Sequence, residues 1–230
     1  MKKLVIVGGI GNGAVALSTV VDINNSEDGY DTWEVLGFLN DSADKAQVEG
    51  FPWLGPIESA SVHRLRSCKD VYFLWTLFST QLRQDMAVRL LGLGIEREKW
   101  ATLVHPTAVV SRFAEIRRGV IVHPLSCVGP GVVIGDHVQL FGQSFVGHDT
   151  RVRNYAYLAN GARISSFVTL DEGAYIGMGA SVREFVQVGK WAIVGMGAVV
   201  LENVEPHTTV VGVPAREIRR GVGNGRYDHR

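Results

Sequence analysis

The residues best suited to chemistry lie together in the segment Phe145-Val146-Gly147-His148-Asp149. Histidine titrates near neutral pH, so a neutral imidazole at His148 can accept a proton from an attacking nucleophile. Asp149 could strengthen that base or hold its tautomer. Neighbouring side chains on a strand point in opposite directions, so the contact requires a turn at Gly147-His148. The residue types alone also allow a solvated surface histidine with no role in chemistry.

An aliphatic residue recurs every six positions from Val104 to Val200, and no insertion breaks the spacing. An α-helix repeats its apolar face about every 3.6 residues and a flat amphipathic strand alternates every two, so neither pattern fits. A period of six indicates short strands separated by corners, which is the hexapeptide signature of a parallel β-helix. His148 follows a repeat position and a glycine, which predicts an outward-facing place at a coil edge. The repeat positions are Val104, Val110, Ile116, Val122, Val128, Ile134, Leu140, Val146, Val152, Leu158, Ile164, Leu170, Ile176, Val182, Val188, Val194 and Val200.

The other histidines raise one alternative, a zinc site on the β-helix. Such a site needs three histidines that converge from neighbouring coils. His123, His137 and His148 are spaced too irregularly for this, so no metal is expected. His105 and His123 each follow a repeat position and precede proline, which predicts structural roles. His137 is expected to be exposed.

A second candidate site lies at the start of the chain. Leu4–Val7 is predicted to be a buried strand, Gly8–Ala14 a glycine-rich turn and Val15–Ile23 a helix. Strand, glycine turn and helix form the arrangement in which a helix N-terminus faces a phosphate group. The turn also fits the G-x-G-x-x-A fingerprint of dinucleotide sites, although a tight turn without a ligand is the alternative.

The rest of residues 1–100 completes a small Rossmann-like parallel-sheet domain. Asn40-Asp41 ends the second predicted strand, where an acid would hold a ribose hydroxyl. The domain is too short for both halves of a dinucleotide fold, so an NAD-dependent oxidoreductase is not expected. The remaining predictions are strands at Val35–Leu39 and Val71–Leu77, a loop at Gly50–Pro56 and a helix at Gln81–Leu93.

The composition excludes several classes of protein. Of the 230 residues, 46% are hydrophobic and 20% charged, and 23 basic residues balance 23 acidic ones. This balance gives no reason to expect nucleic acid or a membrane surface as a partner. No apolar run is long enough to span a bilayer. The two cysteines, Cys68 and Cys127, make neither a disulfide framework nor a metal spacing, which fits the cytoplasm.

The order of these parts resembles a known family. A Rossmann-like domain, then Leu103–Ala108, then hexapeptide coils and finally Val211–Arg216, is similar to the sugar acetyltransferases of the sialic-acid O-acetyltransferase, bacillosamine N-acetyltransferase and perosamine N-acetyltransferase type. The sharpest local motif is Phe145–Asp149, which matches the family's V-x-H-[DE] segment. The resemblance implies a nucleotide-sugar-binding domain over 1–100, a left-handed β-helix over 101–216 and a tail over 217–230. It also implies a homotrimer that binds acetyl-CoA between subunits.

The resemblance also assigns roles to individual residues. It implies His148 as general base, assisted by Asp149. Phe78 stands where the family has glycine in a turn before Arg83, and Tyr157 stands where some relatives have histidine, although Tyr157 can still donate to a thioester carbonyl. These departures leave the nucleotide and sugar of the acceptor open. The implied substrate-binding residues are Ile10, Gly11, Asn12, Asn40 and Asp41, and the implied cofactor-binding residues are Tyr157, Ser166, Met178 and Met196.

We therefore expect a cytoplasmic, trimeric acetyltransferase without a metal. It would move an acetyl group from acetyl-CoA to the amine of a nucleotide-linked amino (dideoxy) sugar. The same base could serve a sugar hydroxyl, and the donor could carry a longer acyl chain. A non-catalytic trimeric scaffold that keeps only the β-helix is the alternative from a different class. The presence of His148 and Asp149 argues against the scaffold, whereas Phe78 indicates an unusual acceptor site.

Overall fold

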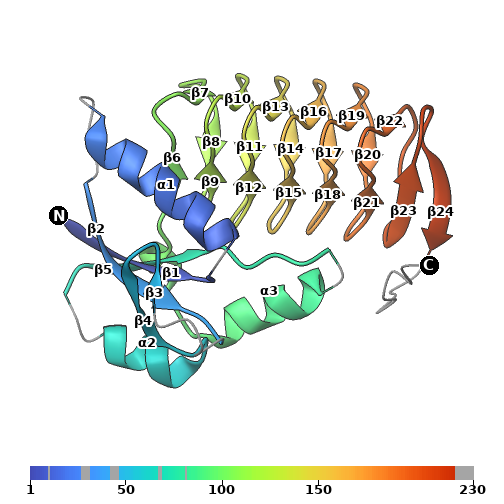
Figure 1. Cartoon of the computed structure of the whole chain (residues 1–230). Helices are drawn as coiled ribbons and strands as arrows, with labels where there is room; N and C mark the ends of the chain where they lie inside the picture. The colour runs from blue at the N-terminus through green and yellow to red at the C-terminus, as the bar shows by residue number, and fades with distance from the viewer. Residues whose placement is uncertain (10, 27–31, 42–46, 67–68, 81, 221–230) are drawn as a thin grey trace.

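The computed structural model describes residues 1–9, 11–26, 32–41, 47–66, 69–80 and 82–220. Within these ranges, a small α/β domain lies against one side of a long three-sided prism of β-strands (Figure 1). The predicted fold class, a Rossmann-like parallel sheet followed by a left-handed parallel β-helix, is confirmed. None of the described helices combines the length and the apolar character that a membrane crossing requires.

The α/β domain is built on a five-stranded sheet of order β3-β4-β2-β1-β5, in which β3 runs antiparallel to β4. Residues 4–7 of the central strand β1 are 0% exposed, because a parallel strand is covered on both faces. The elements are β1 (Lys2–Val7), α1 (Asn12–Asn25), β2 (Trp33–Leu39), β3 (Gln47–Val48), β4 (Phe51–Gly55), α2 (Ser59–Arg66), β5 (Val71–Trp75), α3 (Arg83–Gly92) and the short 3-10 helix η1 (Arg97–Lys99).

One sequence prediction for this domain is wrong, and one helix was not predicted. The loop expected at Gly50–Pro56 contains strand β4, which pairs with β2. Helix α2 has no counterpart among the predictions. The glycine and prolines around β4 indicate a loop when taken alone, but pairing beside β2 outweighs this local preference. The helix predicted at Gln81–Leu93 is present as α3, although it begins at Arg83, and residue 81 lies outside the described residues.

The prism consists of two-residue strands, and each strand from β6 to β22 ends at a repeat position of the sequence. They are β6 (Leu103–Val104), β7 (Val109–Val110), β8 (Glu115–Ile116), β9 (Ile121–Val122), β10 (Cys127–Val128), β11 (Val133–Ile134), β12 (Gln139–Leu140), β13 (Phe145–Val146), β14 (Arg151–Val152), β15 (Tyr157–Leu158), β16 (Arg163–Ile164), β17 (Thr169–Leu170), β18 (Tyr175–Ile176), β19 (Ser181–Val182), β20 (Gln187–Val188), β21 (Ile193–Val194) and β22 (Val199–Val200). Strands β23 (Thr208–Val211) and β24 (Arg216–Arg220) close the stack.

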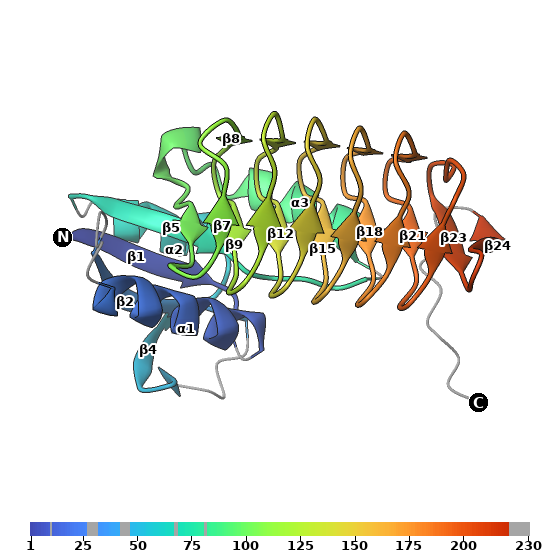
Figure 2. The same ribbon diagram turned by 90° about the horizontal axis from the view of Figure 1, so that it is seen from above.

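These strands form three faces, and successive coils follow one another from β6 to β24 (Figure 2). The docked face, which carries the α/β domain, has the order β24-β23-β21-β18-β15-β12-β9-β6. The second face has the order β22-β19-β16-β13-β10-β7, and the third has β20-β17-β14-β11-β8. Residues 217–220, which the sequence analysis placed in a tail, belong to strand β24 and pair with β23.

Three edges join these faces. The histidine edge joins the second and third faces and includes the turns at 147–150, 165–168 and 183–186. The methionine edge joins the docked and second faces and includes the turns at 177–180 and 195–198. The tryptophan edge joins the third and docked faces and includes the turns at 135–138, 171–174 and 189–192.

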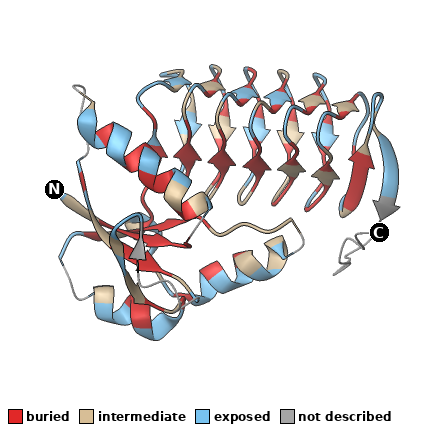
Figure 3. Cartoon of the chain, in the orientation of Figure 1, coloured by how far each residue is buried: buried red, intermediate tan, exposed pale blue. Residues whose placement is uncertain are grey.

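The core of the prism is the stack of repeat positions. From Val122 to Val200 every one of them is at most 2% exposed, and Figure 3 shows the buried strands facing the α/β domain. Burying such a side chain stabilises a fold by about 1.5–3 kcal/mol. Val104 is 37% exposed, because no coil lies above the first one.

The α/β domain is fixed to the docked face by polar contacts at two places. Near the first coils, Nε2 of His105 lies 2.9 Å from Oδ2 of Asp22, and Nδ1 of His123 lies 3.0 Å from Oγ1 of Thr19. Both partners belong to α1, so the two histidines have the structural roles predicted for them. Burial lowers the pKa of His123 to about 4, so it is neutral near pH 7.

The second place is the start of α3. The guanidinium of Arg83 donates to the carbonyl oxygens of Gly173 at 2.7 Å and Trp191 at 2.9 Å on the tryptophan edge. Burial lowers the pKa of Arg83 to about 10, and the group is still charged at neutral pH. Arg83 therefore ties α3 to coils far along the prism from α1.

His137 is not exposed as the sequence predicted. Its ring is half-buried, packed edge-on against Trp100 at a centroid distance of 4.7 Å and stacked on Tyr155 at 5.6 Å. Burial lowers the pKa of His137 to about 4. The prediction failed because Trp100, which covers the ring, comes from the segment that joins the two parts of the chain.

Candidate active site

His148 and Asp149 form the turn between β13 and β14 on the histidine edge. Nδ1 of His148 lies 2.8 Å from Oδ2 of Asp149, and the two side chains are 50% and 54% exposed. Asp149 has φ of 56°, a left-handed conformation that aspartate tolerates better than most residues. The turn therefore supplies the contact that two adjacent strand residues could not make.

Two glycines of the preceding coil leave room for this turn. A Cβ on Gly129 would lie 2.9 Å from the backbone nitrogen of His148. A Cβ on Gly131 would collide with Oδ1 of Asp149. The glycines of the hexapeptide pattern are thus required here by close approach, and the coil above fixes the place of both side chains.

The contact with Asp149 determines which nitrogen of His148 can act as a base. A carboxylate only accepts hydrogen bonds, so Nδ1 of the neutral imidazole carries the proton. The lone pair is then on Nε2, on the side of the ring away from Asp149. An exposed imidazole with this tautomer can take a proton from a nucleophile that reaches the histidine edge.

The carboxyl end of a parallel sheet is where α/β folds bind their ligands, and the region at this end between α1 and the prism is called the cleft below. Gly11 caps the N-terminus of α1 without a side-chain hydrogen bond, and Asn12 is the first residue of the helix. The side chain of Asn40 lies so close to Gly9 that a Cβ there would collide with it. The structure thus brings Gly11, Asn12 and Asn40 to one edge of the sheet. Ile10 lies outside the described residues.

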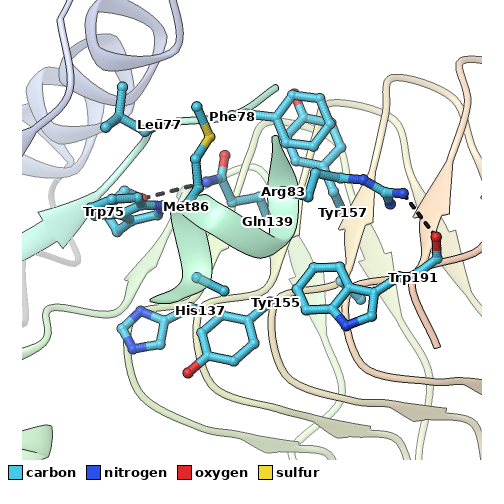
Figure 4. Close-up of a pocket in the computed structure, with 12 residues that line it drawn as sticks. Trp75, Leu77, Phe78, Arg83, Met86, His137, Gln139, Tyr155, Tyr157 and Trp191 are labelled. Atoms are coloured by element: carbon cyan, nitrogen blue, oxygen red, sulfur yellow. Dashed lines mark hydrogen bonds between the residues drawn. The ribbon is translucent and has the colours of Figure 1, made fainter. Parts of the chain in front are cut away.

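Tyr157 of the docked face closes this cleft from the side of the prism. Its ring is 8% exposed, and its hydroxyl is hydrogen-bonded to the side chain of Asn12. Burial raises the pKa of Tyr157 above its ordinary value, so the hydroxyl stays protonated and can donate. Phe78 stacks on Tyr157 at a centroid distance of 3.7 Å, and Tyr175 lies 5.4 Å from Phe78 (Figure 4 shows Phe78 over Tyr157).

Phe78 and Arg83 also line a small pocket between α3 and the prism. Figure 4 shows the pocket with Trp75, Gln139 and Tyr155 among its walls. Oε1 of Gln139 is buried there without a hydrogen-bond partner. The aromatic side chain at position 78 therefore packs against Tyr157 and Tyr175 of the docked face.

Asp41 does not face the glycine turn. Its carboxylate accepts hydrogen bonds at 2.6 and 2.7 Å from Arg89 of α3 and at 3.1 Å from the amide of Ile57. The hydrogen bonds from Arg89 lower the pKa of Asp41 below its usual range, although partial burial opposes them. Asp41 thus links the end of β2 to α3, and of the predicted pair only Asn40 borders the turn.

The predicted cofactor residues lie on different sides of one chain. Ser166 is half-buried on the histidine edge, one coil beyond His148. Met178 and Met196 are 53% and 74% exposed on the methionine edge. Tyr157 lies on the docked face. In the described part of the chain, these four residues therefore lie at three different places on the prism.

The same separation applies to the base and the cleft. In a triangular prism, the edge between the second and third faces lies opposite the docked face. His148 is on that edge, whereas Tyr157 and Asn12 meet at the docked face. The cleft and His148 of one chain therefore lie on opposite sides of the prism.

The histidines weighed for a zinc site are also separated. His123 begins a turn on the methionine edge, whereas His137 lies on the tryptophan edge and His148 on the histidine edge. Within the described ranges, no three histidine, cysteine or carboxylate side chains gather as a possible ligand set.

One neighbour of the candidate base was missed from the sequence. Phe167 packs its ring edge-on to His148 at a centroid distance of 5.1 Å. Paired strand residues such as Phe145 and Arg163 show that a coil spans three hexads. Counting one coil on from Asp149 gives Phe167, so the hexapeptide register could have identified it.

Comparisons with known proteins agree with this architecture. No protein-family model matches the chain. Over 122 residues it is 31% identical to UDP-N-acetylbacillosamine N-acetyltransferase of Bacillus subtilis (strain 168), a match that covers 53% of this chain and 51% of that relative. The chain thus spans about half the length of the curated relative that it matches.

Two solved structures match nearly the whole chain. A histidine mutant of perosamine N-acetyltransferase from Caulobacter crescentus, in complex with CoA and GDP-perosamine, has a TM-score of 0.82 and 25% identity, over 94% of this chain and 97% of its own. The acetyltransferase domain of PglB from Neisseria gonorrhoeae FA1090, in complex with acetyl coenzyme A, has a TM-score of 0.79 and 26% identity, over 94% and 99%. The expected resemblance to hexapeptide-repeat sugar N-acetyltransferases is confirmed.

Proposed function

We propose that this chain, which resembles the hexapeptide-repeat sugar N-acetyltransferases over nearly its whole length, transfers the acetyl group of acetyl-CoA to the amine of a nucleotide-linked amino sugar. The observation that carries the proposal is the His148–Asp149 contact of 2.8 Å on an exposed edge. The relative from Caulobacter crescentus is a perosamine N-acetyltransferase seen with CoA and GDP-perosamine, which supports both the donor and the acceptor class.

The reaction then follows from the tautomer of His148. The acceptor amine attacks the thioester carbonyl carbon, forming a C–N bond, and Nε2 of His148 takes the proton that the nitrogen loses. The tetrahedral adduct collapses, the C–S bond breaks, and the departing thiolate of CoA takes a proton back from the imidazolium. Asp149 holds the ring and stabilises the imidazolium that forms between these steps.

The acceptor would be held in the cleft of the α/β domain, so residues 1–100 act as the nucleotide-sugar-binding domain. The free N-terminus of α1 at Gly11 and Asn12 suits the diphosphate, because its amides carry a partial positive charge. Asn40 completes this half-site among the described residues, and a role for Ile10 stays a prediction from the sequence. Asp41 supports the cleft through Arg89.

Acetyl-CoA would bind along the β-helix of residues 101–216. Met178 and Met196 offer exposed apolar surface for the pantetheine arm on the methionine edge, and Ser166 lies beside the base. The hydroxyl of Tyr157 can donate to the thioester carbonyl, as an oxyanion donor does.

These half-sites require more than one copy of the chain. Because His148 and the cleft are on opposite sides of the prism, a complete site needs the histidine edge of one subunit beside the docked face and methionine edge of another. Closed cyclic assembly of identical chains satisfies this at every interface. We therefore include a homotrimer with active sites between subunits, located in the cytoplasm.

The test is thiol release from acetyl-CoA by the purified protein with a panel of UDP-, dTDP- and GDP-linked amino sugars. Release with one acceptor is expected, and His148→Ala should lower kcat by about a hundredfold or more. His207→Ala is the matched control and should leave kcat unchanged. Equal rates for His148→Ala and the native chain would contradict the role of His148.

Failure with every amino sugar would contradict N-acetylation. The same panel of sugars with hydroxyl acceptors would then test O-acetylation, and propionyl-CoA in place of acetyl-CoA would test a longer acyl donor. A chain that releases no thiol with any of these, and binds neither acetyl-CoA nor a nucleotide sugar in calorimetry, would be the non-catalytic scaffold.

A further inference from the structure

Two phenylalanines continue the histidine edge beyond the candidate base. The ring of Phe167 stands at 86° to the imidazole of His148, with a centroid distance of 5.1 Å. The ring of Phe185, one coil further, stacks on Phe167 at 5.1 Å and 5°. We call these two residues the phenylalanine pair. Neither phenylalanine is among the site residues predicted from the sequence, and neither takes part in the proposed reaction.

The phenylalanine pair is not explained by the core of the prism. Phe167 is 47% exposed and Phe185 is 73% exposed, so both rings keep much of their apolar surface in water. Both residues also have a left-handed backbone, with φ of 60° and 64°. For a bulky residue this conformation costs about 1–2 kcal/mol relative to its preferred one.

The same turn position in the preceding coils shows the contrast. It is occupied by Phe113, Gly131 and Asp149 in turn. Of these, Gly131 and Asp149 have the left-handed backbone, and both are residue types that enter this region more readily. Phenylalanine with a left-handed backbone begins in the coil immediately after the base. What Phe167 contacts there is the imidazole, and its amide also donates to the carbonyl oxygen of His148 at 3.1 Å.

The imidazole needs such a contact because little else holds it. His148 is half exposed, and its side chain is hydrogen-bonded to Asp149, which is itself half exposed. A rotation of the ring by half a turn would put Cδ2 where Nδ1 lies and Cε1 where Nε2 lies. This would break the contact with Asp149 and turn Nε2 away from a nucleophile. An aromatic edge or face against the ring restricts this rotation by close packing and by its quadrupole.

We propose that Phe167 is a positioning residue that keeps Nδ1 of His148 on Asp149 and Nε2 toward the acceptor, and that Phe185 holds Phe167 in place. The inference rests on the proposed function for its catalytic consequence. Its structural part, the orientation and tautomer of the imidazole, does not depend on any substrate.

The kinetic test compares Phe167→Met, Phe167→Tyr and Phe185→Met in the full-length protein. Phe167→Met keeps apolar bulk but removes the ring, and its kcat should fall about tenfold with KM for both substrates within about twofold, because loss of orientation acts on the reaction step. Phe167→Tyr keeps the ring and should restore kcat to within about twofold of the native value. Phe185→Met should lower kcat by only about threefold.

The structural test is the nitrogen-15 NMR spectrum of His148 in each variant, assigned with His148→Gln. The native protein should show one neutral tautomer, protonated on Nδ1, with a stable coupling to that proton. Phe167→Met should show a mixture of both tautomers, and Phe167→Tyr should show the native pattern. This readout needs no acceptor, so it tests Phe167 even if the N-acetyltransferase reaction is not found.

Subunit assembly must be followed alongside, because the pair lies on an exposed edge. Sedimentation velocity on each variant should give the native oligomeric state. The proposal is overturned if Phe167→Met retains one tautomer and native kcat. It is also overturned if Phe185→Met matches Phe167→Met in kcat and both dissociate, since the edge would then serve assembly and not the orientation of His148.

Discussion

The docked face and the histidine edge of the same prism support their functional side chains in opposite ways. On the docked face, Tyr157 is buried between Phe78 and neighbouring aromatic rings, and its hydroxyl is bonded to Asn12. On the histidine edge, His148 is half exposed and depends on one carboxylate and one ring. The first region resembles a protein core, whereas the second resembles one half of an interface.

The comparison shows what a rigid repeat can and cannot contribute to an active site. The prism fixes the backbone at both places equally well, because both lie in the same stack of buried aliphatic residues. It cannot complete both sites within one chain, because the edge and the face lie on opposite sides. The exposed half-site is therefore interpreted as the part that a second copy covers.

The largest expected effect is a loss of stability at low pH. It comes from His123 and His137, which are buried, whereas His148 is half exposed. Burial lowers the pKa of His123 and of His137 to about 4, while an unfolded histidine titrates near 6.5. Below pH 6.5 the unfolded chain therefore binds protons that the folded chain does not, and stability falls as pH falls toward 4. Each histidine should lower the free energy of unfolding by about 2 kcal/mol between pH 7.5 and pH 5.

Urea unfolding between pH 7.5 and 5 measures this loss. His137→Phe keeps an aromatic ring against Trp100 and should remove about half of the pH dependence. His63→Phe, on α2, is the control and should leave the dependence unchanged. A free energy of unfolding that is constant over this range would show that the two histidines are not held neutral by burial.

The second effect tests the exposed region through Asp149. Asp149→Asn keeps a residue that tolerates the left-handed turn but removes the charge that stabilises the imidazolium. The value of kcat should fall by about a hundredfold, with little change in Tm. Asp171→Asn, whose partners are Arg153 and Gln187, is the matched control. If both variants retained native kcat, Asp149 would have no part in the reaction.

The third effect concerns Arg83, which fixes α3 to the tryptophan edge of the prism. Arg83→Met removes the guanidinium that donates to Gly173 and Trp191, leaving buried carbonyl oxygens without partners. The free energy of unfolding should fall by about 2 kcal/mol. KM for the nucleotide sugar should rise while acetyl-CoA binding is unchanged, because α3 borders the cleft and not the methionine edge. Arg66→Met, an exposed residue paired with Glu96, should change stability by less than about 0.5 kcal/mol.

The two regions also differ in how far the sequence predicts them. The hexapeptide period fixes the place of every strand from β6 to β22, and therefore puts His148 at an edge and turns it toward Asp149. The repeat is local, so its geometry follows from spacing alone. The same spacing could have identified Phe167, because this residue is one coil beyond Asp149.

The docked face depends on contacts between distant parts of the chain. The pairing of Asp41 with Arg89, the burial of His137 by Trp100 and the stacking of Phe78 on Tyr157 join segments that no short-range pattern connects. Strand β4 was missed for the same reason, because its pairing with β2 outweighs its glycine and prolines. Roles for Gly11, Asn12, Asn40 and the cofactor residues stay predictions.

Complementation between two inactive variants would show directly whether the base and the cleft of an active site come from different chains. His148→Ala lacks the base, and Asn12→Trp fills the cleft. After the two proteins are unfolded together, refolded and checked for mixed assemblies, random mixing into trimers should restore about a quarter of the native rate, since three-quarters of the trimers are mixed and each has one intact site in three. No recovery in assemblies shown to be mixed would mean that the base and the cleft of one chain act together, and would contradict the account.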